Sequence, residues 1–354
     1  LDEMYGGAIE PLVSRRGECH VFGFVASFLD DGLVPDETPL LEQAAQLLGE
    51  LLLQPATRNG HLKSEYVDGE RENLVAEIKS LLNDKRSYAN NRLIEEMCAD
   101  EPFHINRLGS LEQAEKLNVT KLNRYYREVL AAARMEVYYC GSAAPQQVEL
   151  AWREALMDLP RHELLDLPET IIRMPKGEKQ VTDHLDVTQG KLAMGYRCSS
   201  DDYPAMVLAN LIFGGTSNSK LFLNVRERLS LCYYASSSYA RSKNILTVSS
   251  GVETADFERA EAEIGRQLQA VQQGDWEDWE QEGALQAIRA SLLSLSDSQG
   301  ALENFYLGQI AAGVEETPEE LAAALEQVTK ERIVAAAQTV KPDTVYFLRG
   351  KEEA

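Results

Sequence analysis

The chain has 354 residues, of which 57 are acidic and 35 are basic, so its formal net charge is −22. This deficit of positive charge argues against a nucleic-acid-binding protein and against a partner that is an anionic membrane surface. A solvated acidic surface explains the charge most simply, and steering of basic peptides is an alternative explanation. The length exceeds that of one ordinary domain, so two domains are expected.

The five cysteines are scattered and contain no CxxC pair. This pattern indicates neither a disulfide framework nor a thiolate metal site, and it favours a reducing, cytoplasmic compartment. No apolar run approaches the roughly 18 residues that a membrane span requires, and no secretory signal opens the chain. The first residues, LDEMYGG, read as the end of a helix, so we expect the natural protein to continue upstream of Leu1.

In the first half, the pattern predicts a helix end at Leu1–Tyr5, stopped by Gly6 and Gly7. The expected strands are 18–28 and 136–140. The expected helices are 40–53, 62–82, 88–98, 111–117, 120–130 and 144–157.

Pro160, Pro168 and Pro175 interrupt residues 159–179, which are therefore the expected linker. Beyond it, the expected strands are 180–185, 191–197, 232–236, 244–250 and 344–348. The expected helices are 203–213, 257–272, 276–295, 301–312, 318–326 and 330–340.

Short segments of the first half recur in the second half in the same order. The matched tripeptides are 80–82 with 291–293, 119–121 with 328–330, and 137–139 with 345–347, at offsets of 211, 209 and 208 residues. A near-constant offset indicates duplication. We therefore predict an α+β fold of two homologous domains, 1–158 and 180–354, each with a mainly antiparallel sheet and helices packed on one face.

Two carboxylates in the expected helix 62–82 are candidate functional residues. Glu70 and Glu77 are seven residues apart and so lie on nearly the same helix face. The repeat places Ile288 opposite Glu77, so only the first half carries an acid at this position. An exposed charged face is the alternative interpretation.

Other catalytic motifs are absent from the sequence. The five histidines form no HExxH, HxxEH or HxxxH pattern, so no helix supplies the histidine pair of a hydrolytic zinc centre. There is no GxSxG motif, and the segment 214–217 lacks the lysine of a phosphate-binding loop.

The most suggestive stretch is 214–235, GGTSNSKLFLNVRERLSLCYYA, which reads as a helix followed by a strand. Arg226 and Tyr233 lie across that corner. A guanidinium provides a fixed fork of donors, and a phenol can donate to a carbonyl oxygen that gains charge. The alternative is a surface arginine beside a packed tyrosine.

This stretch resembles the second-domain signature of the pitrilysin/insulinase family of zinc peptidases, which runs GG, Ser-x-Leu-Phe, then Arg, six residues and Tyr. The likeness covers the whole chain, and Glu70 with Glu77 matches the family's ExxxxxxE helix. The resemblance implies that Glu77 is a zinc ligand supported by Glu70. It also implies that Arg226 and Tyr233 hold the substrate backbone.

The sequence departs from the family because it lacks HxxEH, which supplies two zinc ligands and the general base. Glu77 alone does not hold a hydrolytic zinc. Ser230 also replaces a glycine that is common before Leu-x-Tyr.

The segments LDEMYGGAIEPLVSRRGECHVFGF and RSYANNRLIEEMC resemble the YfmF-type subgroup, whose bacterial members lack HxxEH. That resemblance implies a homodimer or a heterodimer with a sister chain that keeps the motif.

The sequence therefore predicts a non-catalytic subunit that binds an extended peptide and completes a peptidase assembly, with no cofactor of its own. One alternative is an active zinc endopeptidase whose HxxEH lies in about 60 to 70 residues upstream. Another is a scaffold that binds no peptide.

Overall fold

The computed structural model describes residues 2–36, 38–175 and 177–350. Contacts divide the chain into two compact units. Unit 1 comprises Leu1–Lys79 and Arg107–Glu169, and unit 2 comprises Ser80–Asn106 and Thr170–Ala354. The segment Ser80–Asn106 thus belongs to the second unit although it lies in the first half of the sequence. Leu1, where the expected helix end begins, lies outside the described residues.

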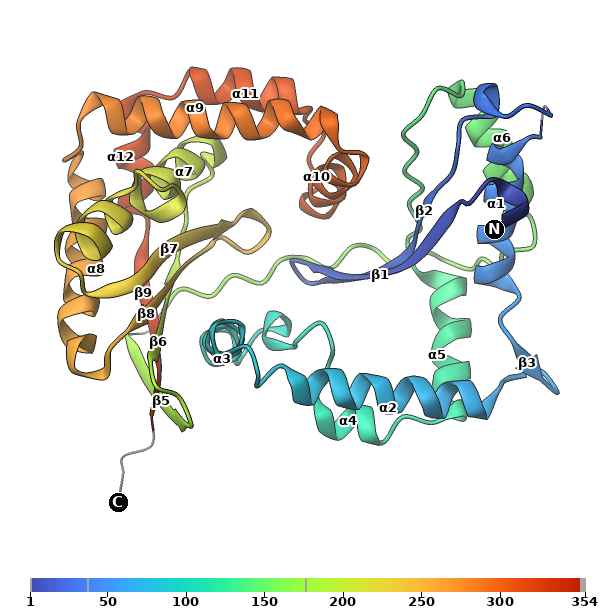
Figure 1. Cartoon of the computed structure of the whole chain (residues 1–354), viewed down its shortest axis with the longest axis horizontal. Helices are drawn as coiled ribbons and strands as arrows, with labels where there is room; N and C mark the ends of the chain where they lie inside the picture. Colours follow the sequence, from blue (N-terminus) through green and yellow to red (C-terminus); the bar gives the residue numbers. More distant parts are fainter. Residues whose placement is uncertain (1, 37, 176, 351–354) are drawn as a thin grey trace. The chain divides into compact units, whose positions relative to one another are not determined.

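Unit 1 contains two small antiparallel sheets and a set of helices (Figure 1). The hairpin of β1 (Ala8–Arg16) and β2 (Cys19–Ser27) pairs along its whole length, and β3 (Thr57–Arg58) pairs with β4 (His61–Leu62). The helices are α1 (Leu40–Leu53), α2 (Ser64–Ser80), α4 (Leu111–Glu115), α5 (Val119–Ala132) and α6 (Pro145–Ala155), with short turns at Asp2–Met4 and Asp31–Leu33.

Helix α1 packs closely against α6 in unit 1. A Cβ atom on Gly49 would lie 2.5 Å from the carbonyl oxygen of Ala155, so only glycine allows this approach. A small core of Met4, Val34, Leu40 and Ala44 lies beside α1.

One expectation for unit 1 was wrong, and one strand was not anticipated. Residues 136–140 form no strand, and Val137 is 44% exposed. Alternation of side chains marks a segment that can pair, but a strand also requires a neighbour. Conversely, β1 was not among the expected strands. It contains Pro11, and a proline is tolerated in a strand that pairs on one side only.

Unit 2 is built on a five-stranded sheet in the order β5-β9-β6-β8-β7. Only β5 and β9 run parallel, and the other neighbours are antiparallel. The strands are β5 (Lys179–Leu185), β6 (Gly190–Arg197), β7 (Cys232–Ala240), β8 (Ile245–Val252) and β9 (Lys341–Gly350). The mainly antiparallel α+β fold is therefore confirmed, and β5 and β7 form the two edges of this sheet.

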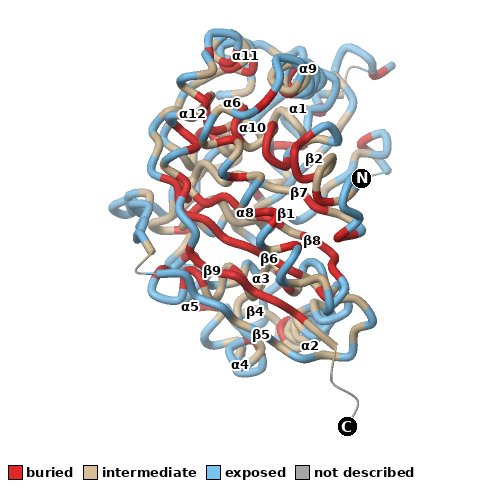
Figure 2. Tube along the Cα trace, turned by 90° about the vertical axis from the view of Figure 1, so that its left-hand side faces the viewer, coloured by how far each residue is buried: buried red, intermediate tan, exposed pale blue. Residues whose placement is uncertain are grey.

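Helices cover both faces of the sheet in unit 2. The helices are α3 (Lys85–Met97), α7 (Tyr203–Asn210), α8 (Phe257–Gln273), α9 (Asp278–Ser294), α10 (Gln299–Ala312), α11 (Pro318–Glu326) and α12 (Lys330–Gln338). Leu192 and Met194 of β6 point into the large core beneath α7, α8 and α12, whereas Ala193 packs with Leu93 of α3 on the other face. Figure 2 shows β6, β8 and β9 as the buried strands between these layers.

Candidate functional site

The candidate site lies where two π-helical segments lead into the edge strand β7. Helix α7 continues as a π-helix at Leu211–Gly215, and a second π-helix spans Leu221–Arg228. A Cβ on Gly214 would lie 2.6 Å from the Leu221 side chain and 2.7 Å from the hydroxyl of Ser237. The glycine pair of the sequence is therefore explained in part by close packing of the π-helix against β7. π-Helical turns are frequent at functional sites.

A left-handed residue turns the chain from the second π-helix into the strand. Ser230 has φ +49°, and its amide donates to the carbonyl of Arg226 over 3.1 Å. The next amide, of Leu231, donates to Val225 over 3.0 Å. Glycine adopts this conformation without the steric cost that a side chain adds. This geometry accounts for the glycine that the resembling family commonly carries here.

Tyr233 is the extra residue of a β-bulge. Cys232 pairs with Val252 and Tyr234 pairs with Gly251, so no residue of β8 lies opposite Tyr233. The Tyr233 side chain is 65% exposed. Bulges on edge strands re-aim a side chain and commonly occur beside active sites. The bulge thus presents a phenol to solvent on the free edge of the sheet.

Arg226 holds the backbone of this bulge. Its Nε donates to the carbonyl oxygen of Tyr233 over 3.0 Å. The guanidinium also lies 4.7 Å from the centre of the Phe222 ring, and it forms a 2.9 Å ion pair with the neighbouring Glu227. The structure therefore brings Arg226 and Tyr233 together, through the carbonyl oxygen and not through the phenol.

Glu70 and Glu77 lie on α2 in unit 1, and both are exposed. Glu70 accepts a hydrogen bond of 3.3 Å from Asn73, and Glu77 forms a 3.1 Å ion pair with Arg107. A catalytic zinc centre needs three protein ligands close together. Within residues 2–36, 38–175 and 177–350, no group of three or more His, Cys, Asp or Glu side chains could hold a metal ion. The donors around Glu77 therefore do not fit a zinc centre.

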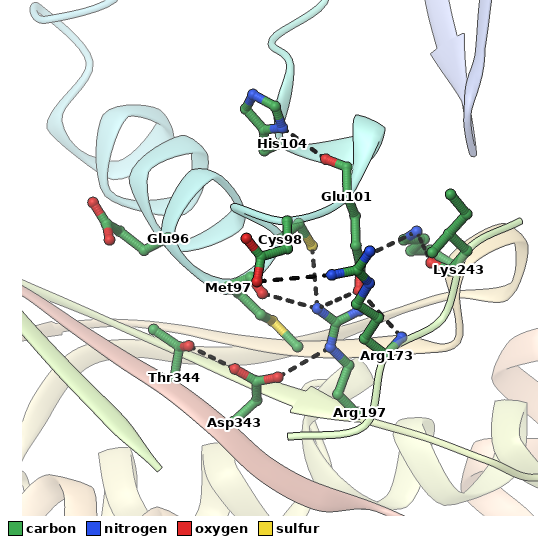
Figure 3. Close-up of polar contacts among 12 residues, drawn as sticks. Glu96, Met97, Cys98, Glu101, His104, Arg173, Arg197, Lys243, Asp343 and Thr344 are labelled. Carbon is green, nitrogen blue, oxygen red and sulfur yellow. Dashed lines mark hydrogen bonds and ion pairs between the residues drawn. The ribbon is translucent and has the colours of Figure 1, made fainter. Parts of the chain in front are cut away.

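Sequence reasoning missed a buried ionic cluster in unit 2 (Figure 3). Glu101, Arg197 and Lys243 are 3%, 1% and 0% exposed. Two nitrogens of Arg197 contact the two oxygens of Glu101, each over 3.1 Å, and Lys243 contacts the same carboxylate over 2.9 Å. Arg197 also donates to Asp343 over 3.0 Å. The cluster joins the segment after α3 to the ends of β6 and β9 and to the turn between β7 and β8.

Ionisation in the cluster is set by a balance of burial and charge. Burial alone would raise the pKa of Glu101, but hydrogen bonds and charges from Lys243 and Arg197 outweigh it and hold the pKa below its ordinary value. Burial raises the pKa of Cys98 to about 12, so this thiol stays protonated at neutral pH. The cluster is therefore a neutralised structural centre without an activated nucleophile.

Comparison with known proteins places the chain in a family. The model of the peptidase M16 inactive domain matches residues 116–288. A curated protein of Bacillus subtilis (strain 168), "Probable inactive metalloprotease YmfF", is 36% identical over 359 residues, covering 100% of this chain and 84% of that protein. The chain therefore belongs to the peptidase M16 family, and it is a homologue of a protein described as a probable inactive metalloprotease.

Solved structures agree with this assignment. A conserved protein from Enterococcus faecalis V583 has a TM-score of 0.90 at 26% identity, covering 100% of this chain and 84% of that one. For a protease from Helicobacter pylori, the TM-score is 0.79 at 16% identity, and the match covers 98% of this chain and 83% of that one. For a peptidase M16 inactive domain from Pseudomonas fluorescens, the TM-score is 0.76 at 14% identity, and the match covers 99% of this chain and 82% of that one. The last two show the fold alone. The expected resemblance to the pitrilysin/insulinase (M16) peptidases is confirmed. The sequence pattern indicated the YfmF-type subgroup, and the curated relative is named YmfF.

Among the helices of the described ranges, none combines the length and apolarity that crossing a bilayer needs.

Proposed function

We propose that this chain is the peptide-binding, non-catalytic subunit of a peptidase assembly. An HxxEH-bearing sister chain would supply the zinc and the hydrolytic step, and a homodimer is the alternative assembly. The chain's own part is to bind an extended peptide along β7 and to orient its backbone with Arg226 and Tyr233.

The bulged edge strand is the observation that supports this proposal most strongly. Within the described part of unit 2, β7 pairs with β8 on one side only. A free edge offers backbone donors and acceptors to an added strand. Tyr233 is exposed on that edge strand, and Arg226 fixes the carbonyl of the bulge. An exposed phenol held by a rigid backbone suits recognition of a peptide carbonyl.

The donor set supports a non-catalytic role. Glu77 is paired with Arg107, and neither the described residues nor the whole sequence provides a histidine pair beside it. The relative of Bacillus subtilis is itself described as a "probable inactive metalloprotease". Chemistry at a bound peptide would therefore depend on groups outside these 354 residues.

Binding of a labelled, unstructured peptide without proline tests the proposal. We expect Tyr233→Ala to weaken binding about tenfold, because exposed tyrosines at an interface contribute on the order of 1 to 2 kcal/mol. Trp279→Ala is the matched control, since this aromatic residue belongs to α9 and not to β7 and is 50% exposed. A peptide N-methylated at alternate residues should bind poorly, because it lacks the donors that strand addition requires.

Two results would count against the proposal. Equal affinity of Tyr233→Ala and the unmodified chain would favour a scaffold that binds no peptide at this edge. Hydrolysis of the peptide by the purified chain, stopped by a metal chelator, would show that the chain is catalytic by itself.

A further inference from the structure

We infer that Arg86, at the start of α3, is a positioning residue for the peptide-binding edge of β7. It comes from the segment Ser80–Asn106, which lies far from β7 in the sequence and belongs to unit 2 by its contacts. The consequence for peptide binding rests on the proposed function, whereas the effect on the strand itself does not.

Arg86 contacts two side chains of β7 directly after the bulge. Its guanidinium lies 4.3 Å from the centre of the Tyr234 ring, and its Nη2 donates to the Ser236 hydroxyl over 3.1 Å. Residues two apart on a strand project from the same face. The planar guanidinium of Arg86 therefore contacts the first two side chains that follow Tyr233 on that face. It stacks on the Tyr234 ring and donates a hydrogen bond to Ser236.

The Tyr234 ring is supported from the sheet side as well. Its partner across the ladder is Gly251, and a Cβ on that glycine would lie 2.6 Å from the ring. The ring thus occupies the space that a side chain on β8 would fill. Since Arg86 lies over the same ring, movement of Tyr234 is restricted by contacts with both β8 and α3.

The first turn of α3 fixes the backbone of Arg86. Asp84 caps the helix by accepting hydrogen bonds from the amides of Arg86 and Ser87 over 3.0 and 3.1 Å. Further along the helix, Ala89 and Leu93 pack on the sheet. The helix is therefore held at both its cap and its apolar face, which gives the Arg86 side chain a defined origin.

The same segment also holds the far end of β7. Lys243 lies in the short turn Arg241–Lys243 that joins β7 to β8, and its ammonium contacts the buried Glu101 that follows α3. Segment Ser80–Asn106 thus contacts β7 beside the bulge and the turn at its other end. Of these two contacts, only the one made by Arg86 adjoins Tyr233.

Arg92 provides a matched control on the same helix. It pairs with Glu95 and Glu96 of α3 and with Asp183 of β5, the opposite edge of the sheet. Loss of Arg92 removes a guanidinium from α3 without touching β7. The comparison of the two arginines separates a local effect on the bulge from a general loosening of the helix.

The test uses the full chain with 3-fluorotyrosine at position 233. We expect Arg86→Ala to shift or broaden the fluorine resonance and to speed amide exchange in 234–238 about tenfold. Arg86→Lys keeps the charge but not the planar fork. It should therefore show more than half of the change that Arg86→Ala causes. Arg92→Ala should leave the resonance unchanged. An unchanged resonance in Arg86→Ala, or an equal change in Arg92→Ala, would overturn the inference.

Peptide binding by the same variants separates this inference from the proposed function. We expect Arg86→Ala to weaken binding about fivefold, and Arg92→Ala to have no effect. If the resonance moves in Arg86→Ala but Tyr233→Ala binds peptide normally, the proposed function fails and the positioning role stands. If Tyr233→Ala loses binding while Arg86→Ala changes neither readout, the positioning role fails and the proposed function stands.

Discussion

Two arginine sites of unit 2 differ in what surrounds them. Arg197 is buried, and its guanidinium nitrogens pair with the carboxylates of Glu101 and Asp343. Arg226 is 39% exposed at its side chain and holds a backbone carbonyl beside an exposed phenol. Burial makes the first site expensive to disturb, whereas exposure leaves the second available to a ligand. Within one sheet, the Arg197 site thus contributes to stability, whereas the Arg226 site is the one proposed to bind a peptide.

The largest expected effect is on stability and comes from Glu101→Gln. This nearly isosteric change leaves the buried cations Arg197 and Lys243 with Asp343 as the remaining carboxylate. Removing one partner of a buried ion pair costs about 3 kcal/mol or more. Urea unfolding should show this loss. The matched surface variant Arg259→Ala, which breaks an exposed pair with Asp256, should lose less than about 1 kcal/mol. Equal losses in the two variants would show that burial makes no difference.

Acid should reveal the same cluster in the unmodified chain. The fold holds the pKa of Glu101 below the value of an unfolded glutamate. Ionised Glu101 therefore stabilises the fold fully at pH values above the unfolded pKa, and this stabilisation is lost as the pH falls through the folded pKa. Glu101→Gln should therefore show a flatter loss of stability between about pH 5 and pH 3 than the unmodified chain. Parallel curves would mean that other carboxylates, such as Glu96 and Asp202, whose pKa values are also lowered, account for the acid sensitivity.

The smallest expected effect comes from Ser230→Gly at the exposed corner. The substitution relieves a left-handed conformation and should stabilise the chain by about 0.5 to 1 kcal/mol, with peptide affinity unchanged. Asn244→Gly is the control, because Asn244 has φ +50° but accepts a hydrogen bond from Tyr239 that glycine cannot replace. If Asn244→Gly increases the stability as much as Ser230→Gly does, relief of backbone strain at residue 230 does not explain the gain.

Much of unit 2 could be predicted from local pattern. The helix at 318–326 and the strands around 180–185 and 191–197 were expected close to their observed bounds. These segments have strong periodicity and lie against a continuous core, so local and tertiary preferences agree. The strand expected at 136–140 had the right alternation but no described partner, and pairing is a property of the fold.

The candidate site was only partly accessible to sequence reasoning. The sequence supplied Arg226, Tyr233 and the glycines before them, because these residues are close along the chain and carry a recognisable motif. It did not supply the bulge, since the register of β7 against β8 depends on both strands. Glu70 and Glu77 were recognised as a pattern, but Arg107 beside Glu77 was not expected. The domain ranges 1–158 and 180–354 remain predictions, beside the division found from contacts.

The sequence by itself determined the family, the α+β composition and the absence of a histidine pair within these 354 residues. These properties depend only on residue identities and on short spacings along the chain. Only the tertiary structure decided that Tyr233 is the unpaired residue of a bulge, that Glu101, Arg197 and Lys243 meet, and that Arg86 lies over Tyr234. The ionic cluster and the Arg86 contact join residues roughly a hundred or more positions apart, so no local pattern encodes them. The bulge depends on the register of two whole strands, which a single strand does not specify.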